Sequence, residues 1–425
     1  MAEEIWVHPA EKLLVRLKPP SGMIHVGDER ILRVRRTRSR YNQIAEVILF
    51  DMDSSASSQL PADLFYDRSF ECRSGRTAEE RLDNFEKLIT VHGVLSFSEF
   101  FLLFVKKLRY WFEYIGVCTV IRIVPLLPIG LLRRFADGAG WLVYHLDRKN
   151  RRVALANLEA AFGDTYTPKQ RERIARRSLQ IFGRSFLELF WTPRLNASNV
   201  AKYITIEDEK LLESIVSTKA SRPVVGVTIH FGNFEWASAY YSLRGYNGLI
   251  LMQRFKNDRL TVLFQRLRET SGQTSVTQEN SMVRFFKALK RGVPVGILID
   301  LTLKMSDPAV IFRTFGLPMR ATMMHAVLHD RTGAPIMPFV ALPRKGGGYL
   351  IRAFEPMQFP AGTPYQEIAQ ACWDKFEPLI REHPEQWLWG YKHWRYRPAN
   401  PEKPHPFYAN RSELFDAEFD KINAN

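Results

Sequence analysis

Residues 223–235 read PVVGVTIHFGNFE. The first seven residues are a short, mostly apolar run with several β-branched side chains, which is typical of a buried strand. Gly232 relaxes the backbone for a turn, Asn233 is a suitable helix N-cap, and Glu235 is favourable in a first helical turn. This stretch therefore predicts a buried strand, a tight turn and a helix in succession.

The same alternation of apolar runs and helical segments continues toward the C-terminus. Helical segments are predicted at 258–270 and 280–292, and PRKGGGYLI predicts a hairpin turn between the last two strands. Because buried strands that alternate with helices form parallel sheets covered on both faces, we expect an α/β fold with a mostly parallel central sheet flanked by helices. The apolar runs that predict strands are 222–229, 248–253, 294–300, 334–342 and 348–354.

The sequence before residue 200 is different in character. Residues 1–95 predict a small appended N-terminal module of unknown role, with strands in 23–40 and 45–53 and a helix over 77–93. Helices are then predicted over 148–163, which ends at a glycine, and over 167–191, which begins with Thr-Pro. We divide the chain into the module (1–95), a helical segment (96–147), the α/β domain (148–400) and a polar C-terminal tail (401–425).

Two apolar stretches, 97–105 and 114–132, are the candidates for membrane contact. Arg122, Pro125 and Pro128 interrupt the second stretch, which argues against a spanning helix. Cations and aromatic side chains lie between the two stretches, as they do in helices that rest among lipid headgroups. We therefore expect an amphipathic, membrane-associated segment, with a buried helical hairpin of the core as the alternative. The acidic opening MAEEIWVHPAEKLL does not read as a cleavable signal peptide.

Positive charge is concentrated in the main body of the chain. The formal net charge is +15, and residues 1–95 hold 14 Lys and Arg against 15 Asp and Glu, so the remainder carries an excess of 16 positive charges. Such a body favours nucleic acid, an anionic membrane surface, or an acidic or phosphorylated partner. Three widely separated cysteines exclude a disulfide scaffold and a zinc ribbon.

His230 and Glu235 are the candidate catalytic pair. His230 follows a predicted strand, and ligands bind at the carboxyl ends of strands in open α/β sheets. Glu235 is expected to reach back across the turn to one imidazole nitrogen, which would fix the tautomer and stabilise the imidazolium. Such a pair deprotonates a hydroxyl or amine that attacks an activated acyl group. A simple strand-to-helix turn is the alternative.

HFGNFE resembles the His-x-Gly-Asn-Trp-Glu signature of bacterial lipid A biosynthesis acyltransferases, which belong to the His-x4-Asp/Glu glycerolipid acyltransferases. Further segments are similar to that family over about residues 96–398, and Phe234 replaces the usual Trp. The terminal motif also departs from the family pattern, since Tyr391, Lys392 and His393 stand where a histidine and two arginines are usual. The similar segments are RKNRRVALANLEAAFGD (148–164), QRFKN (253–257), GILIDL (296–301), FRTFGLPMRATMMHAVLHDRTGAPIMPF (312–339) and QWLWGYKHWRYRP (386–398).

The resemblance implies a glycerolipid acyltransferase-like fold and an O-acyltransferase. It would move a fatty acyl group from acyl carrier protein or coenzyme A to a hydroxyl of a lipid A precursor or related glycolipid. His230 would act as general base without a covalent acyl-enzyme, at the cytoplasmic face of a bacterial inner membrane. Besides His230 and Glu235, the candidate substrate-binding residues are Gly232, Asn233, Arg254, Asn257, Asp300 and Arg320.

The implied partners are the acyl thioester, an anionic lipid acceptor and the membrane surface. We expect no cofactor beyond the thioester, no nucleic acid and no metal, since His325 and His329 lack a third ligand. Other acceptors stay open: a phosphatidylinositol mannoside, an aminolipid or a lysophospholipid. A non-catalytic basic protein that binds membrane or nucleic acid is the alternative from another class.

Overall fold

The computed structural model describes residues 3–8, 13–15, 31–39, 42–50, 97–216 and 223–423. The chain divides into two compact units, residues 1–109 and 110–425. The predicted helix over 77–93 lies outside the described residues. In the first unit, four strands form an antiparallel sheet in the order β2-β1-β3-β4. They are β1 (Glu3–His8), β2 (Leu13–Val15), β3 (Ile31–Ser39) and β4 (Asn42–Phe50).

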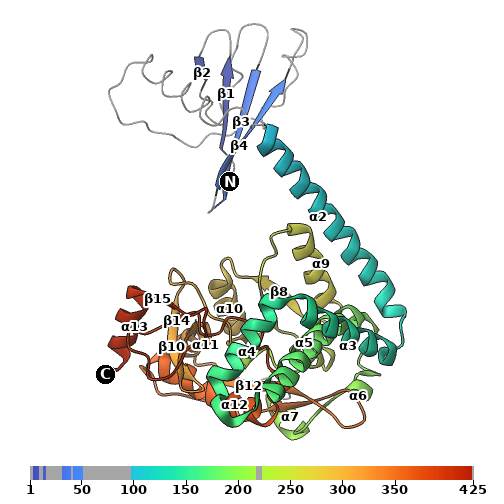
Figure 1. Ribbon diagram of the computed structural model, residues 1–425. Helices are drawn as coiled ribbons and strands as arrows, with labels where there is room; N and C mark the ends of the chain where they lie inside the picture. The colour runs from blue at the N-terminus through green and yellow to red at the C-terminus, as the bar shows by residue number, and fades with distance from the viewer. Residues whose placement is uncertain are drawn as a thin grey trace. The chain divides into compact units, whose positions relative to one another are not determined.

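A seven-stranded sheet forms the centre of the second unit, in the order β5-β13-β12-β6-β9-β7-β8. Figure 1 shows two of its strands, β8 and β12, among the surrounding helices. All neighbouring pairs are parallel except β12 and β13, which form the antiparallel hairpin predicted from the glycine-rich turn. The predicted α/β fold with a mostly parallel sheet is therefore confirmed. The strands are β5 (Ile204–Ile206), β6 (Val225–Thr228), β7 (Leu249–Met252), β8 (Thr274–Thr277), β9 (Val295–Leu298), β12 (Ile336–Pro343) and β13 (Tyr349–Ala353).

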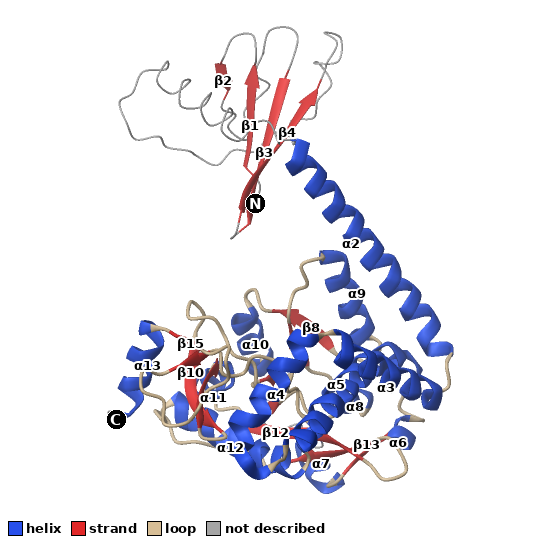
Figure 2. Ribbon diagram, in the orientation of Figure 1, coloured by secondary structure: helices blue, strands red, loops and turns tan. Residues whose placement is uncertain are grey.

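Helices cover both faces of this sheet (Figure 2). Side chains alternate along a strand, so Val225 and Val227 of β6 belong to one hydrophobic cluster while Val224 belongs to the other. The first cluster includes α4 (Arg148–Phe162), α10 (Ser281–Lys290), α11 (Met324–Thr332) and α12 (Tyr365–Glu382). The second includes α7 (Glu209–Val216), α8 (Phe234–Leu243) and α9 (Asp258–Glu269), and α5 (Pro168–Trp191) contributes to both.

Prolines separate the first two long helices. Helix α2 runs over Phe97–Ile123, a short 3-10 helix contains Pro125, and α3 begins after Pro128 and runs over Ile129–Leu146. None of the helices in the described part of the chain is both long and apolar enough to cross a membrane. One face of α3 is buried at Leu132, Ala136, Gly140 and Tyr144.

Two segments differ from the sequence-based prediction. Phe315 and Gly316, with φ of +53° and +78°, form the turn of a hairpin between β10 (Ala309–Thr314) and β11 (Leu317–Thr322), which the sequence did not predict. Residues 401–425, predicted as a polar tail, contain β15 (Asn410–Arg411), paired with β14 (Tyr396–Arg397), and α13 (Glu413–Asn423). The tail prediction is wrong because Phe415 is fully buried and anchors α13 to the domain.

A candidate active site at the carboxyl ends of the parallel strands

Three adjacent parallel strands end at one edge of the central sheet. β9 lies between β6 and β7. Asp300 follows β9, His230 follows β6 and Arg254 follows β7. Because the carboxyl ends of parallel strands meet at the same edge, side chains distant in sequence converge there. The sequence placed His230 at this edge, and the strand order brings Asp300 beside it.

The imidazole of His230 is bonded to the carboxylate of Asp300. Asp300 Oδ1 lies 2.8 Å from His230 Nδ1, and Asp300 Oδ2 accepts a hydrogen bond from the His230 backbone N–H at 2.9 Å. The carboxylate therefore fixes both the backbone and the ring of His230. An ionised carboxylate only accepts hydrogen bonds, so Nδ1 carries a proton and Nε2 of the neutral ring is a free base.

Asp300 is fully buried, whereas the His230 side chain is 12% exposed. Burial opposes ionisation of Asp300, but the charge and hydrogen bonds of His230, together with the charge of His393, lower the pKa of its carboxyl. Trp387 Nε1 also donates to Asp300 Oδ2 at 2.9 Å. The arrangement is an ionised, buried carboxylate beneath a histidine at the protein surface, which suits a general base with an orienting acid.

The expected contact between Glu235 and His230 is wrong. Glu235 forms a two-point ion pair with Arg268 of α9, at 2.9 Å from Nε and 2.5 Å from Nη2. Helix α8 begins at Phe234, whose ring lies against the imidazole with centroids 4.8 Å apart. The next residue is rotated by about 100° around the helix, and this turns Glu235 toward α9. The pair also holds the pKa of Arg268 above its usual value, although burial opposes that charge.

Gly232 is required by the backbone of the turn. Its φ is +57°, and its amide donates to the Gln386 carbonyl at 3.0 Å. A Cβ at this position would overlap the carbonyl of Ala341 in β12. The glycine thus lets the turn lie directly against the sheet and against the segment that carries Trp387, as the sequence indicated for the turn.

Asn233 caps α8, as predicted. Its Oδ1 accepts from the Trp236 backbone N–H at 2.9 Å, and its Nδ2 donates to Glu188 of α5 at 2.5 Å. The side chain is fully buried. These internal bonds fit a residue that shapes the turn.

Arg254 and Asn257 come from the QRFKN segment after β7. Arg254 is exposed and bonds Asp258 at 2.8 Å and Glu279 at 3.1 Å. Exposed ion pairs of this kind are weak, so the guanidinium can exchange them for a phosphate. Asn257 is buried and donates to the Tyr110 carbonyl at 2.8 Å and to Glu113, which ties α9 to α2.

Arg320 lies on β11 and is buried. Its guanidinium bonds the Glu418 carboxylate at 2.8 Å and the carbonyls of Lys304 and Asp307 at 2.6 and 2.8 Å. These partners give it a structural role, because they join α13 to the loop before β10. The sequence did not reveal this, because Glu418 is 98 residues away.

The Trp-rich segment near the C-terminus forms the base of the site. Trp387, Trp389 and Trp394 are fully buried, so they belong to the core rather than to a membrane interface. His393 stacks on Trp387 with centroids 4.0 Å apart and bonds the Asp300 carbonyl through Nδ1 at 3.0 Å. Burial lowers the pKa of His393. Sequence reasoning missed both residues as supports of Asp300, although they lie in the Trp-rich motif that carries part of the resemblance.

The histidines of HAVLH are buried. His329 Nδ1 bonds the Ala334 carbonyl at 2.8 Å, and burial lowers the pKa of His325 to about 4. Among the described residues, no group of three or more acidic, histidine or cysteine side chains is suited to a metal ion.

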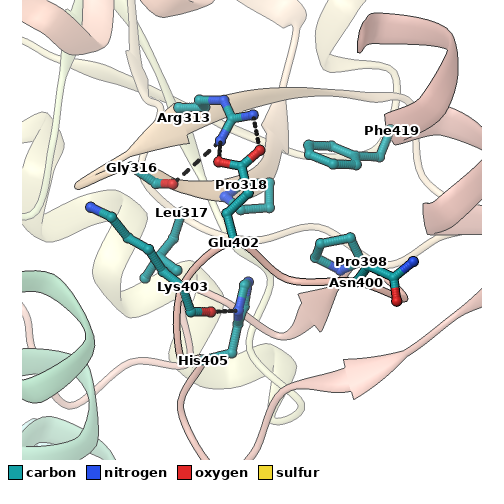
Figure 3. Close-up of a pocket in the computed structure, with 10 residues that line it drawn as sticks. All are labelled: Arg313, Gly316, Leu317, Pro318, Pro398, Asn400, Glu402, Lys403, His405 and Phe419. Atoms are coloured by element: carbon teal, nitrogen blue, oxygen red, sulfur yellow. Dashed lines mark hydrogen bonds and ion pairs between the residues drawn. The ribbon is translucent and has the colours of Figure 1, made fainter.

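Two surface pockets lie away from His230. The first, of about 230 Å³, is lined by the ion pair of Arg313 with Glu402 and by Lys403 and His405 (Figure 3). The second, of about 420 Å³, lies between α8 and the amino ends of β6, β7 and β9. Neither is lined by His230 or Asp300.

Comparison with known proteins identifies relatives over most of the second unit. A family described as bacterial lipid A biosynthesis acyltransferase matches residues 100–396. A curated protein from Haemophilus influenzae, named lipid A biosynthesis acyltransferase, is 25% identical over 299 residues, which is 68% of this chain and 92% of the relative. The matched region contains both His230 and Asp300.

Proposed function

This chain belongs to the bacterial lipid A biosynthesis acyltransferase family and is an acyltransferase, and from this premise we propose that it moves a fatty acyl group from an acyl thioester to a hydroxyl of a lipid A precursor or a related glycolipid. The donor is acyl carrier protein or coenzyme A. The observation that carries the proposal is the His230–Asp300 pair, whose Nε2 is free at the carboxyl edge of the sheet.

In the proposed reaction, His230 Nε2 removes the proton of the acceptor hydroxyl as its oxygen bonds to the thioester carbonyl carbon. Asp300 stabilises the imidazolium that forms. The tetrahedral intermediate collapses, the carbon–sulfur bond breaks, and the thiolate takes the proton from the imidazolium to leave as a thiol. The products are an ester and a thiol. The step uses no covalent acyl-enzyme and no cofactor beyond the thioester.

Positive charge near the site supports anionic substrates. Arg254 and Lys256 are exposed in the loop after β7, at the same sheet edge as His230. Both proposed donors are anionic, and the acceptor of the family is a phosphorylated glycolipid. We assign these two side chains to a phosphate of the acceptor or to the phosphopantetheine arm of the donor.

The direct test is acyl transfer with purified protein. Acyl-acyl carrier protein and acyl-CoA are each incubated with a lipid A precursor, and mass spectrometry follows the lipid and the free thiol. We expect the lipid to gain one acyl chain for each thiol released. If the acyl chain is transferred instead to a phosphatidylinositol mannoside, an aminolipid or a lysophospholipid, that lipid replaces the lipid A precursor as the proposed acceptor. Salt-sensitive binding to DNA without thioester cleavage would contradict the enzyme assignment.

The outer face of α3 supports association with an anionic membrane surface, which we propose to be the cytoplasmic face of the inner membrane. Leu131, Phe135 and Leu142 are 53%, 64% and 50% exposed, and they lie on one side of the helix. Arg134 is exposed on the same helix, and Arg148 and Lys149 are exposed just after it. Apolar side chains beside cations suit a helix that lies in the headgroup region.

Replacing Leu131 and Phe135 together with serine is expected to lower binding to phosphatidylglycerol vesicles by about 10²–10⁴-fold, because each side chain contributes about 1.5–3 kcal/mol when it is fully buried and about 1.4 kcal/mol corresponds to a tenfold change in affinity. Vesicle flotation measures the bound fraction. Leu414→Ser is the matched control, since Leu414 is 65% exposed on α13. Equal vesicle binding by wild type, the double serine variant and Leu414→Ser would show that α3 does not contact the membrane.

A further inference from the structure

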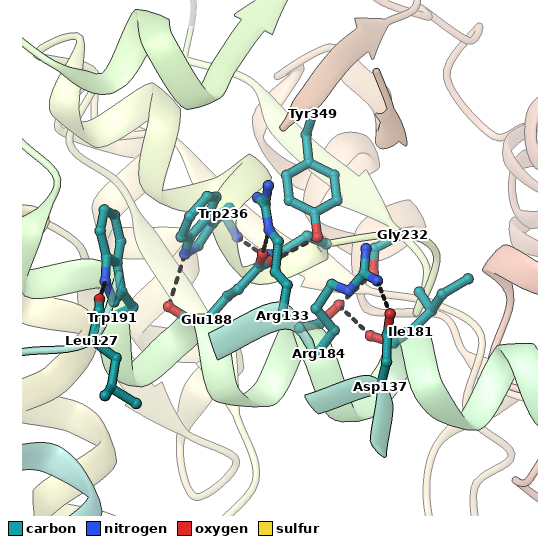
Figure 4. Close-up of polar contacts among 12 residues, drawn as sticks. Leu127, Arg133, Asp137, Ile181, Arg184, Glu188, Trp191, Gly232, Trp236 and Tyr349 are labelled. Atoms are coloured by element: carbon teal, nitrogen blue, oxygen red, sulfur yellow. Dashed lines mark hydrogen bonds and ion pairs between the residues drawn. The ribbon is translucent and has the colours of Figure 1, made fainter. Parts of the chain in front are cut away.

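Three ion pairs join α3 to α5, and two of them lie one helical turn apart. Arg133 Nε lies 2.5 Å from Glu188 Oε1, and Arg184 Nη2 lies 2.6 Å from Asp137 Oδ2 (Figure 4). On each helix the two partners are four residues apart, so both pairs lie on the same contact face. The two pairs share this geometry, but the Glu188 side chain is fully buried whereas the Asp137 side chain is 29% exposed, and they differ in what else they touch.

The Glu188 carboxylate also holds the turn that follows His230. It is fully buried and accepts from Asn233 Nδ2 at 2.5 Å and from the Tyr349 hydroxyl at 2.6 Å. One turn earlier on α5, the Ser185 hydroxyl donates to the Gly232 carbonyl at 2.8 Å. Helix α5 thus forms hydrogen bonds with two successive residues of the turn, Gly232 and Asn233. Asp137 instead bonds arginines of α5 through its carboxylate.

Asn233 connects these hydrogen bonds from α5 to the imidazole of His230. Asn233 Oδ1 caps α8, and Phe234, the first residue of that helix, packs on the imidazole of His230. His230 itself is fixed on its other side by Asp300. A shift of Asn233 therefore moves the turn while Asp300 stays with β9, and this changes how Nε2 faces a bound hydroxyl.

Arg133 provides the counter-charge that a buried carboxylate needs. A buried carboxylate without a partner is unstable, and it takes up a proton instead of staying charged. Burial opposes the charge of Arg133, yet the attraction and hydrogen bond of Glu188 hold the pKa of the guanidinium above its usual value. Arg133 therefore places a positive charge directly against the buried Glu188 carboxylate.

We propose that Glu188 and Arg133 are positioning residues for the acyl transfer, which hold Asn233 and through it set the orientation of His230. The inference rests on the proposed function, because it assigns a role to the turn that carries the general base. Neither residue contacts His230 or Asp300 through a side-chain bond that the structure shows. Their effect on the reaction is therefore indirect.

Glu188→Asp is the primary test. Aspartate keeps the charge opposite Arg133, but it is one methylene shorter and cannot reach Asn233 Nδ2. We expect kcat to fall at least tenfold with KM for the thioester within about twofold, because misplacement of a catalytic group by about 1 Å can reduce the rate 10²-fold. The matched control is Asp137→Asn, which breaks the neighbouring ion pairs of Asp137 with Arg184 and Arg177. It should lower the melting temperature while kcat stays within about twofold.

A double-mutant cycle with Asn233→Ser separates positioning from general loss of stability. Serine is still a good N-cap for α8, but it lacks the amide that reaches Glu188. If both residues act through one contact, the Glu188→Asp/Asn233→Ser protein should have the kcat of the slower single variant. The Asp137→Asn/Asn233→Ser protein should show the product of its two single effects.

The inference is overturned if Glu188→Asp and Asn233→Ser are folded and keep wild-type kcat, or if their effects multiply. Should Glu188→Asp not fold, a wild-type kcat in Asn233→Ser alone would overturn it. His230→Gln, measured in the same assay, distinguishes failure of the proposed function from failure of the positioning role alone. If His230→Gln stays active, the proposed function fails. If only His230→Gln is inactive, the positioning role alone fails.

Discussion

Replacing His230 with glutamine is expected to lower kcat/KM for acyl transfer by about 10²–10⁴-fold, the usual contribution of a general base. Glutamine retains an N–H donor that can face Asp300, so the buried carboxylate keeps a partner and the fold is preserved. It has no nitrogen that can accept the proton of the acceptor hydroxyl. The loss should therefore appear as slower release of thiol in a protein with a normal melting curve.

The control for this variant is His383→Gln, a partly exposed histidine at the end of α12 that pairs with Glu382 at 3.6 Å. It is expected to keep kcat/KM within about twofold. His230→Gln with near wild-type turnover would falsify the assignment of His230 as general base. An unfolded His230→Gln protein would show instead that the ring is needed for stability, and His230→Asn would then replace it in the assay.

The strand, turn and helix around His230 were predictable because their causes are local. The apolar run, the positive φ of Gly232 and the capping side chain of Asn233 each depend on a few neighbouring residues. The same holds for the strand–helix alternation and the glycine-rich hairpin, both of which are confirmed. Local signals therefore placed His230 at the carboxyl edge of the sheet.

The partner of His230 was not predictable in the same way. Asp300 is 70 residues from His230, and the two meet only because β9 lies beside β6 in the sheet. Sequence spacing favoured Glu235 instead, since a side chain five residues away can reach back across a turn. The rotation between successive residues of α8 turns Glu235 to Arg268, and no local pattern reports that geometry.

Long-range contacts also determine the environment of the residues that the resemblance assigns to substrate binding. Arg320 is bonded to Glu418, and Asn257 to the Tyr110 carbonyl, so both side chains serve contacts between distant segments. Arg254 is exposed because it lies in the loop after β7, at the carboxyl ends of the strands. Tertiary contacts therefore determine which side chains of these segments face solvent.

Asp300→Asn is expected to reduce kcat/KM by about 10²–10⁴-fold, because it changes the tautomer of His230. Asp300 Oδ2 accepts from two donors, the His230 backbone N–H and Trp387 Nε1. In the variant the amide oxygen must take this place, since an NH2 group there would face two N–H groups. The NH2 group then faces Nδ1, so the ring proton moves to Nε2, and the nitrogen that should accept a proton already carries one.

The same substitution predicts a change in acid stability. The pKa of Asp300 is lowered in the folded protein, so its charge stabilises the fold above the unfolded pKa of about 3.9 and this contribution is lost as pH falls through the folded pKa. Asp300→Asn removes that contribution. Urea unfolding should show a difference in the free energy of unfolding between wild type and variant that narrows below about pH 4.

Glu235→Gln makes the same change, a carboxylate to an amide, at the other candidate for the acid that orients His230. Comparing it with Asp300→Asn shows which of the two carboxylates has that role. It breaks the buried pair with Arg268, which is expected to destabilise the protein by about 3 kcal/mol. Glu235 does not contact the imidazole, so the Nδ1 proton of His230 stays in place. Compared at equal folded fraction, this variant should retain at least tenfold more kcat than Asp300→Asn. The reverse order would return the orienting role to Glu235 and leave Asp300 as a structural acid.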